Sequence, residues 1–163
     1  MPILETRTLH WPDEAACAAS AARLAGLLMA APALHSAFIE LHGPLGAGKT
    51  TFARHLLHAV GVQGRVKSPT YAVMEPYALQ RNGAAFNVSH FDFYRFNDPQ
   101  EWEDAGFRDV FAAPGLKLAE WPEKAEGLLP PADLRIHIEP LAEPLRAVRV
   151  EAHTALGQVL LAW

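Results

Sequence analysis

The spacing of apolar and polar side chains divides the first third of the chain into alternating strands and helices. Residues 3–10 alternate in polarity, which predicts a short strand. An alanine-rich helix is expected from the segment Trp11–Glu14, whose proline and acids suit a first helical turn, to about Met29. The apolar run Ala37–His42 predicts a buried strand. After a glycine-rich segment, Lys49–Val60 has the pattern of a second helix.

The remaining two thirds of the chain contain a hairpin signal and several short elements. Tyr71–Leu79 and Ala84–Phe91 flank Asn82-Gly83, a dipeptide typical of a two-residue hairpin turn. The pattern then predicts a short helix over Asp98–Ala105. Three strands are predicted after it, at Gly115–Glu120, Leu134–Glu139 and Arg146–His153. The apolar tail Leu156–Trp163 fits either a strand or a helix. These elements predict one α/β domain over residues 1–163, with helices flanking a mixed, mainly parallel sheet that includes an antiparallel hairpin.

Composition narrows the class of protein. The chain has 163 residues, 50% of them hydrophobic, which is enough for a full core in one domain. Cys17 is the only cysteine, so no internal disulfide can form, and this fits a reducing cytoplasm. The N-terminal segment has no basic flank followed by an apolar run, so no signal peptide is predicted. The apolar stretch Ala15–Leu34 is interrupted by Arg23 and Pro32, so a membrane span is not predicted either. The net charge of −4 gives no support for direct binding of DNA or RNA.

One segment carries specific chemistry. GPLGAGKT, at residues 43–50, matches the P-loop pattern G-x-x-x-x-G-K-[ST] between a predicted strand and a predicted helix. Its glycines let the backbone approach phosphate oxygens, and the helix that follows points its N-terminus at the anion. The residues expected to bind the nucleotide are Gly43, Leu45, Gly46, Ala47, Gly48, Lys49, Thr50 and Thr51. The motif therefore predicts a P-loop NTPase-like three-layer sandwich, with nucleotide at the carboxyl ends of the strands.

The side chains at the end of the loop have separate expected roles. Lys49 would reach the β- and γ-phosphates, Thr50 would bind Mg²⁺, and Thr51 would lie near the α-phosphate. Mg²⁺ usually keeps several waters beside one or two protein oxygen ligands. Asp92 and Glu120 are the candidate carboxylates because each ends a strand-like run. Alternatively, each acid could cap its strand or pair with a neighbouring arginine.

Other residues near these acids allow two interpretations each. Thr70 lies in SPTY, about twenty residues after the P-loop, where switch regions often supply a hydroxyl that senses the γ-phosphate. The same segment could be a plain turn before a strand. His90 would share a strand face with Asp92 and orient the site, or it could be a structural residue. Trp102 belongs to an amphipathic segment that suits either core packing or a partner interface.

Five segments together resemble a known family. GPLGAGKTT, VKSPTY, HFDFYR, DPQEWEDAGFRD and AEWPE occur in the order and at the spacing typical of the TsaE (YjeE) family of bacterial P-loop ATPases. The resemblance covers nearly the whole chain and is strongest up to Trp121. It implies a role in making N6-threonylcarbamoyladenosine at position 37 of tRNAs that read ANN codons. The implied partners are TsaD, which transfers the threonylcarbamoyl group, and its paralogue TsaB, and tRNA would be contacted only through their complex.

The resemblance also implies an activity and residue roles. The chain would be a Mg²⁺-dependent ATPase, weak alone, whose hydrolysis of ATP resets the TsaB–TsaD complex between turnovers in the cytoplasm. The implied functional residues are Lys49; Thr50 and Glu120 at the metal; Asp92 as the acid that positions metal or water; Thr70 in a switch loop; and Trp121 beside the nucleotide.

The sequence departs from the family pattern at two positions. Pro44 replaces the usual Asp or Asn of the P-loop and removes one amide donor. Cys17 stands where relatives have a threonine near the adenine.

Two alternative functions stay open on the residues alone. One is a small-molecule P-loop kinase, although no arginine cluster follows the hairpin. The other is a non-catalytic partner that only binds nucleotide. A GTPase is disfavoured, because the chain has no N-K-x-D or T-K-x-D segment to recognise guanine.

Overall fold

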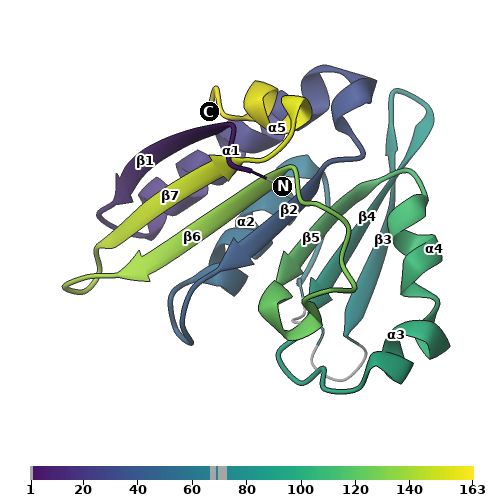
Figure 1. The fold of residues 1–163 in the computed structure, drawn as a ribbon. Coiled ribbons are helices and arrows are strands. Elements are labelled where there is room, and N and C mark those ends of the chain that lie inside the picture. The colour runs from purple at the N-terminus through teal and green to yellow at the C-terminus, as the bar shows by residue number, and fades with distance from the viewer. Residues whose placement is uncertain (1, 67–68, 70–72) are drawn as a thin grey trace.

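The protein is described by a computed structural model over residues 2–66, 69 and 73–163. Its strands are β1 (Glu5–Trp11), β2 (Phe38–His42), β3 (Met74–Arg81), β4 (Ala84–Asp92), β5 (Leu116–Glu120), β6 (Leu134–Pro140) and β7 (Arg146–Ala152). Its helices are α1 (Glu14–Ala30), α2 (Lys49–Val60), α3 (Pro99–Ala105), α4 (Phe107–Ala112) and α5 (Ala155–Leu160), with short 3₁₀ turns η1 (Pro32–Leu34) and η2 (Pro122–Ala125). Figure 1 shows how these elements are arranged.

The described strands form one mixed sheet in the order β1-β7-β6-β2-β5-β4-β3. Parallel pairing occurs in the middle, where β2 pairs with β6 and β5, and β5 pairs with β4. Both ends are antiparallel, through β6–β7, β7–β1 and the β3–β4 hairpin. The α/β fold, the mixed sheet and the hairpin are therefore confirmed. Parallel and antiparallel pairings are equal in number, so the parallel character belongs to the centre of the sheet.

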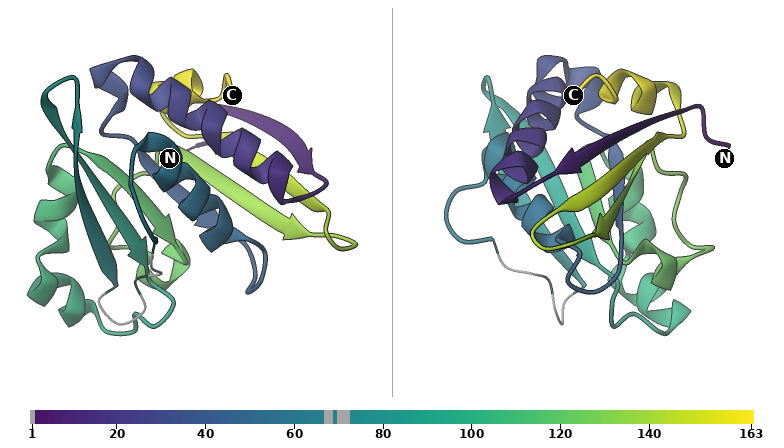
Figure 2. Two further views of the ribbon diagram at one scale, coloured as in Figure 1. Left: turned by 180° about the vertical axis from the view of Figure 1, so that it is seen from behind. Right: turned by 90° about the vertical axis from the view of Figure 1, so that its left-hand side faces the viewer.

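Helices cover the two faces of the sheet unequally. On one face α1 and α2 lie side by side (Figure 2), and their apolar side chains pack on β2, β5, β6 and β7. The opposite face is covered beside β4 and β5, where aromatic side chains of α3 and α4 pack on the sheet. Figure 1 looks onto β6 and β7 from this second side, and no helix lies in front of them. Antiparallel strands tolerate such a water-facing polar surface.

Local sequence signals explain the elements that border the P-loop. The Asp13 side chain caps α1 by accepting a hydrogen bond from the Ala16 amide at 2.9 Å. β2 and β5 are buried along most or all of their length, as expected for central parallel strands. At the hairpin tip, Asn82 and Gly83 both have positive φ angles, of 53° and 80°, as a type I′ turn requires.

Several sequence-based expectations are settled by the fold. The apolar tail forms the helix α5, and α4 is a further helix that the pattern did not predict. Trp102 is 3% exposed and packs in the aromatic cluster with Phe107, so it contributes to the core. The predicted strand Tyr71–Leu79 begins partly outside the described residues. In the described part of the chain, no helix is both long and apolar enough to cross a bilayer.

Candidate functional site

The P-loop connects the end of β2 to the start of α2, and its backbone requires glycine. Gly43 has a φ of 152°, and a Cβ atom there would lie 2.5 Å from the carbonyl oxygen of Ile138. Gly46 and Gly48 also have positive φ angles, of 81° and 108°. These conformations are open to glycine at little cost, which is why the loop can fold back before α2 begins at Lys49.

The loop opens into a cavity of about 350 Å³ at the carboxyl ends of β2, β4 and β5. Its lining residues come from the loop, the start of α2 and the strand ends: Pro44, Leu45, Gly46, Ala47, Gly48, Lys49, Thr50, Thr51, Asp92, Tyr94, Glu120 and Trp121. Most of the residues that the sequence singled out are thus brought into one place. Thr70, the expected switch residue, lies outside the described residues.

A chain of short hydrogen bonds crosses the floor of this cavity. The Thr50 hydroxyl donates to Glu120 Oε1 at 2.6 Å. The other carboxylate oxygen, Oε2, lies 2.7 Å from Nε2 of His90, whose side chain is fully buried. Asp92 is paired with Glu120 across β4 and β5, and its Oδ1 accepts a hydrogen bond from the Tyr94 amide at 3.0 Å. The two acids and the threonine therefore share one edge of the sheet.

Lys49 is buried and held at the same site. Its Nζ donates to the Gly43 carbonyl and, at 3.2 Å, to the Pro44 carbonyl. It also lies 3.7 Å from the centre of the Trp121 ring, within cation–π distance. Burial lowers the pKa of the Lys49 ammonium, and the nearby carboxylates, Glu120 foremost, act in the opposite direction. Pro44 thus contributes a carbonyl acceptor at a position where it cannot contribute an amide.

Trp121 and Tyr94 form one wall of the cavity. Trp121 follows β5 with a left-handed backbone, at φ 55° and ψ 46°, which is uncommon for a bulky residue. Its ring lies against Tyr94, with ring centres 4.9 Å apart. Tyr94 was not predicted to line the site, although its place two residues after Asp92 was a usable signal.

A smaller cavity of about 210 Å³ adjoins the P-loop and contains the side chain of Cys17. It shares Ala47, Gly48 and Thr51 with the main cavity. Burial, helped by Glu14, raises the pKa of the Cys17 thiol to about 12, so the side chain is a neutral thiol near pH 7. Arg146 also lines this cavity and donates from Nε to the Ala47 carbonyl at 2.8 Å. No sequence signal linked Arg146 to the loop, which is 99 residues away.

The donor set at the main cavity is not a self-contained metal site. Across the described ranges, no group of three or more His, Cys, Asp and Glu side chains is arranged to hold a metal ion. Thr50 and Glu120 supply only two oxygen ligands, with Asp92 beside them. Such a set suits Mg²⁺ that takes its other ligands from phosphates and water.

Comparison with known proteins identifies the family. The sequence model of the family described as "Threonylcarbamoyl adenosine biosynthesis protein TsaE" matches residues 11–148, most of the chain. The chain belongs to the TsaE family. The resemblance of the five segments noted above is thereby confirmed.

Individual relatives extend the TsaE match. The tRNA threonylcarbamoyladenosine biosynthesis protein TsaE of Haemophilus influenzae is 38% identical over 158 residues, covering 97% of both chains. The protein of the same name from Bacillus subtilis is 34% identical over 119 residues, covering 73% of this chain and 70% of its own. The crystal structure of YdiB from Bacillus subtilis matches with a TM-score of 0.76 at 23% identity, covering 99% of this chain and 95% of that one. This last match supports the fold.

Proposed function

We propose that this TsaE-family chain binds ATP with Mg²⁺ and hydrolyses the ATP within the assembly that makes N6-threonylcarbamoyladenosine at position 37 of ANN-decoding tRNAs. The biosynthetic role is supported by the family description and by the names of the relatives from H. influenzae and B. subtilis. The nucleotide role is carried by one observation: the Thr50 hydroxyl and the Glu120 carboxylate meet at 2.6 Å beneath a P-loop.

The loop and α2 supply the groups that would hold the phosphates. Backbone amides and the N-terminus of α2 present partial positive charge toward the cavity. Lys49 would exchange its hydrogen bonds to the Gly43 and Pro44 carbonyls for phosphate oxygens. The adjoining cavity at Cys17 is the candidate position for the adenine, since it continues from Ala47 and Thr51.

Hydrolysis would depend on charge neutralisation and positioning. A Mg²⁺ ion held at this site would supply charge neutralisation for the phosphates. Thr50 and Glu120 would hold it, with Asp92 positioning the metal or the attacking water. Water adds to the γ-phosphorus as the bond to the leaving ADP oxygen breaks, which yields ADP and inorganic phosphate. The chain itself forms no covalent intermediate in this scheme.

The expected protein partners are TsaD and TsaB, and hydrolysis would reset their complex between turnovers in the cytoplasm. A protein contact at the mouth of the site is supported by its exposed apolar side chains. Leu45 is 75% exposed at the tip of the P-loop, and Tyr94 is 45% exposed beside it. Apolar groups placed this way suit a protein surface better than open water.

The deciding experiment compares the native chain with Lys49→Ala in repeated rounds of tRNA modification with TsaB and TsaD, while phosphate release is followed. The native chain should show weak ATPase activity alone and clear stimulation by its partners, and Lys49→Ala should lose both the stimulation and multi-round modification. Lys117→Ala, which removes a buried lysine of β5 outside the cavity, is the matched control for folding. Undiminished multi-round modification by Lys49→Ala would refute the proposal.

Two other outcomes distinguish the alternatives. Stoichiometric transfer of phosphate to a metabolite would indicate a kinase. Tight ATP binding without phosphate release in the presence of both partners would indicate a non-catalytic nucleotide-binding subunit.

A further inference from the structure

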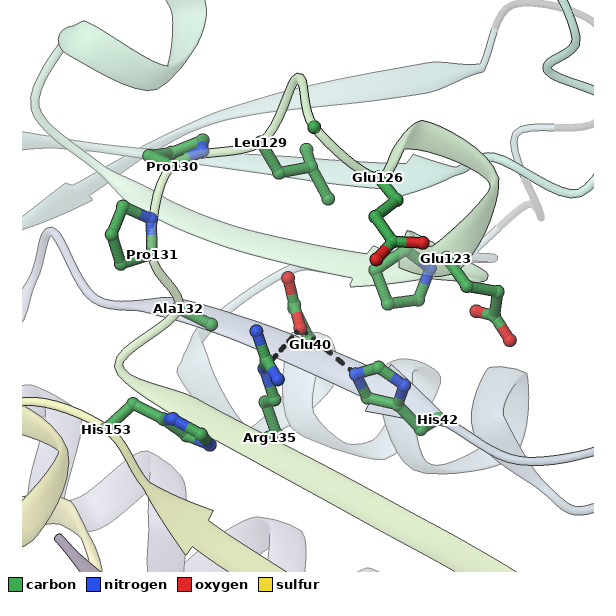
Figure 3. A pocket seen from close by; sticks show the side chains of 12 residues that line it. Glu40, His42, Glu123, Glu126, Leu129, Pro130, Pro131, Ala132, Arg135 and His153 are labelled. Atoms are coloured by element: carbon green, nitrogen blue, oxygen red, sulfur yellow. Dashed lines mark hydrogen bonds and ion pairs between the residues drawn. The ribbon is translucent and has the colours of Figure 1, made fainter. Parts of the chain in front are cut away.

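A second cavity, also of about 350 Å³, lies on the sheet face opposite α1 and α2. Its floor is formed by β2 and β6, and its far wall is η2 with the connection that follows, residues 126–132 (Figure 3). Three carboxylates line it, those of Glu40, Glu123 and Glu126, together with the guanidinium of Arg135. We call this cavity the acidic pocket.

The floor of the acidic pocket carries a buried carboxylate with one oxygen unused. Glu40 is 4% exposed. Its Oε1 receives His42 Nε2 at 3.0 Å and lies 3.0 Å from Arg135 Nε. Both contacts go to the same oxygen, while Oε2 accepts from no described side chain and is not fully enclosed by protein atoms, so it is open to a donor that enters the pocket. In Figure 3 the Glu40 side chain points between Arg135 and His42 toward the opposite loop.

The rim adds two further carboxylates, of which Glu123 also interacts electrostatically with Lys49. Glu123 and Glu126 lie across the pocket from Glu40, and neither forms an ion pair with a described residue. The pocket is lined by three carboxylates and one guanidinium, so acidic side chains outnumber arginine and lysine in its lining. The pocket is therefore suited to a cation.

The remaining walls are apolar and suit an aliphatic stem. Pro122, Pro130 and Pro131 line the pocket with Leu129. Arginine and lysine side chains combine a hydrocarbon stem with a charged head, and they bury the stem along apolar surface. A guanidinium has five donors in a planar fork, so it can meet several separate carboxylate oxygens at once.

We propose that the acidic pocket receives a basic side chain, best matched by arginine, that a protein partner presents from its surface. The head would bind Glu40 Oε2 and the rim carboxylates, and the stem would pack on the prolines. The partner would extend over the polar face of β6 and β7, where no helix covers the sheet. The pocket and the P-loop site are connected by consecutive residues of the chain. His42 of the pocket precedes Gly43 of the P-loop, and Pro122 of the pocket follows Trp121 of the P-loop cavity. The proposal does not depend on the ATPase function.

The test measures binding of blocked amino acids to the full chain by amide chemical-shift mapping. Nα-acetyl-arginine methylamide should give saturable shifts at residues 40–42 and 122–132, and the citrulline counterpart, which has the same shape without the charge, should bind at least tenfold more weakly. Glu40→Gln should weaken arginine binding about tenfold. Because this buried change can disturb folding, the surface double variant Glu123→Gln/Glu126→Gln provides a second measure, with about threefold weakening expected.

A matched control and a peptide separate the remaining outcomes. Glu139→Gln removes an exposed carboxylate of β6 that does not line the pocket, and should leave binding unchanged. A short Gly/Ser peptide with one central arginine should bind at least as tightly as blocked arginine. Equal binding of citrulline, shifts that map to Asp92 and Glu120, or insensitivity to the pocket variants would overturn the proposal. Much tighter binding of free arginine than of the peptide would replace the protein partner with a small molecule.

Discussion

Two buried histidine–glutamate pairs lie on the sheet in different surroundings. His90 and Glu120 meet at 2.7 Å at the ends of β4 and β5, with side-chain exposures of 0% and 2%. His153 and Glu151 meet at 3.2 Å at the end of β7, with exposures of 4% and 9%. The chemistry of the two pairs is the same, so the difference between them must come from their neighbours.

The neighbours of Glu151 compensate its negative charge. Arg149 Nε donates to Glu151 Oε2 at 3.0 Å. His137, on the adjacent strand β6, places its Nε2 3.2 Å from Glu151 Oε1. Burial alone would raise the pKa of Glu151, but the interactions with His153, Arg149 and His137 outweigh it and lower the pKa to about 2. The protein therefore satisfies this carboxylate by itself, which indicates a structural role.

The negative charge of Glu120, by comparison, forms no ion pair with an arginine or lysine among the described residues. Its second oxygen accepts only the Thr50 hydroxyl, and within the described residues no arginine or lysine lies at ion-pair distance. Taking a carboxylate out of water without a full cationic partner is costly. A buried acid of this kind next to a P-loop is explained if an external cation completes it, which is the role proposed for Mg²⁺.

The largest expected effect comes from Glu120→Gln, which keeps the size of the side chain and removes its charge. ATP binding supported by Mg²⁺ should fall by more than the ~10–100-fold that changes in outer-shell partners produce. Binding in the presence of EDTA should change little, and thermal stability should be kept or raised because an uncompensated buried charge is removed. Calorimetric titration with and without Mg²⁺ measures this. Equal losses in both conditions would count against a metal role for Glu120.

The next largest effect is expected at His90, which orients Glu120 without reaching the cavity. His90→Leu removes the imidazole that contacts Glu120 Oε2 and should raise the Mg²⁺ concentration needed for ATP binding by ~10–100-fold. His90→Gln keeps an N–H donor of similar reach and should restore most of the loss.

The second pair supplies the matched control for His90. His153→Leu breaks the equivalent contact at Glu151, so it should lower the melting temperature and leave the Mg²⁺ dependence unchanged. If His90→Leu behaved in the same way as His153→Leu, His90 would be a structural residue and the contrast between the pairs would be lost.

A smaller effect, on stability, is expected from Glu151→Gln. Near pH 7 the variant should be less stable by about 1.5 kcal/mol, the value of hydrogen bonds to a charged group. The folded pKa of Glu151, about 2, lies below its ordinary value of 4.5, so its contribution is full above pH 4.5 and is lost as the pH falls toward 2. Urea unfolding at several pH values should show the two proteins converging over this range. If the difference in unfolding free energy between the two proteins stayed constant with pH, the charge of Glu151 would not be the source of the stabilisation.

Short-range patterns were enough to predict most of the fold. The hairpin followed from Asn82-Gly83, and the buried strands followed from apolar runs that the sheet places at its centre. The P-loop and the family were likewise predicted from local segments, and the match to the family model confirms the family. The tail, Leu156–Trp163, could not be assigned to a helix or a strand from the sequence, because a short apolar run fits either one.

Contacts between residues that are distant in the sequence could not be predicted from local patterns. The spacing placed His90 and Asp92 on one strand, but nothing indicated that His90 would meet Glu120 across β4 and β5. The Arg146 contact to the P-loop depends on where β7 lies in the sheet, as does the grouping of three basic side chains around Glu151. The sequence pattern predicted β6 and β7 as strands, but it did not indicate that one of their faces would be left without a covering helix.

The smallest effect is expected from His137→Gln, because Glu151 keeps two other partners. Burial and the neighbouring His42 lower the pKa of His137, so its imidazole is neutral near pH 7 and adds little charge to the cluster. The loss of stability there should stay below about 0.5 kcal/mol. A histidine whose folded pKa is lowered makes the native protein less stable as the pH falls below 6.5, because the unfolded chain binds the proton more readily. The variant lacks this titration, so between pH 7 and 5 its stability should fall less than that of the native protein. Urea midpoints at pH 7 and pH 5 test this, and a large loss at pH 7 would show that Glu151 depends on each of its partners as Glu120 depends on His90.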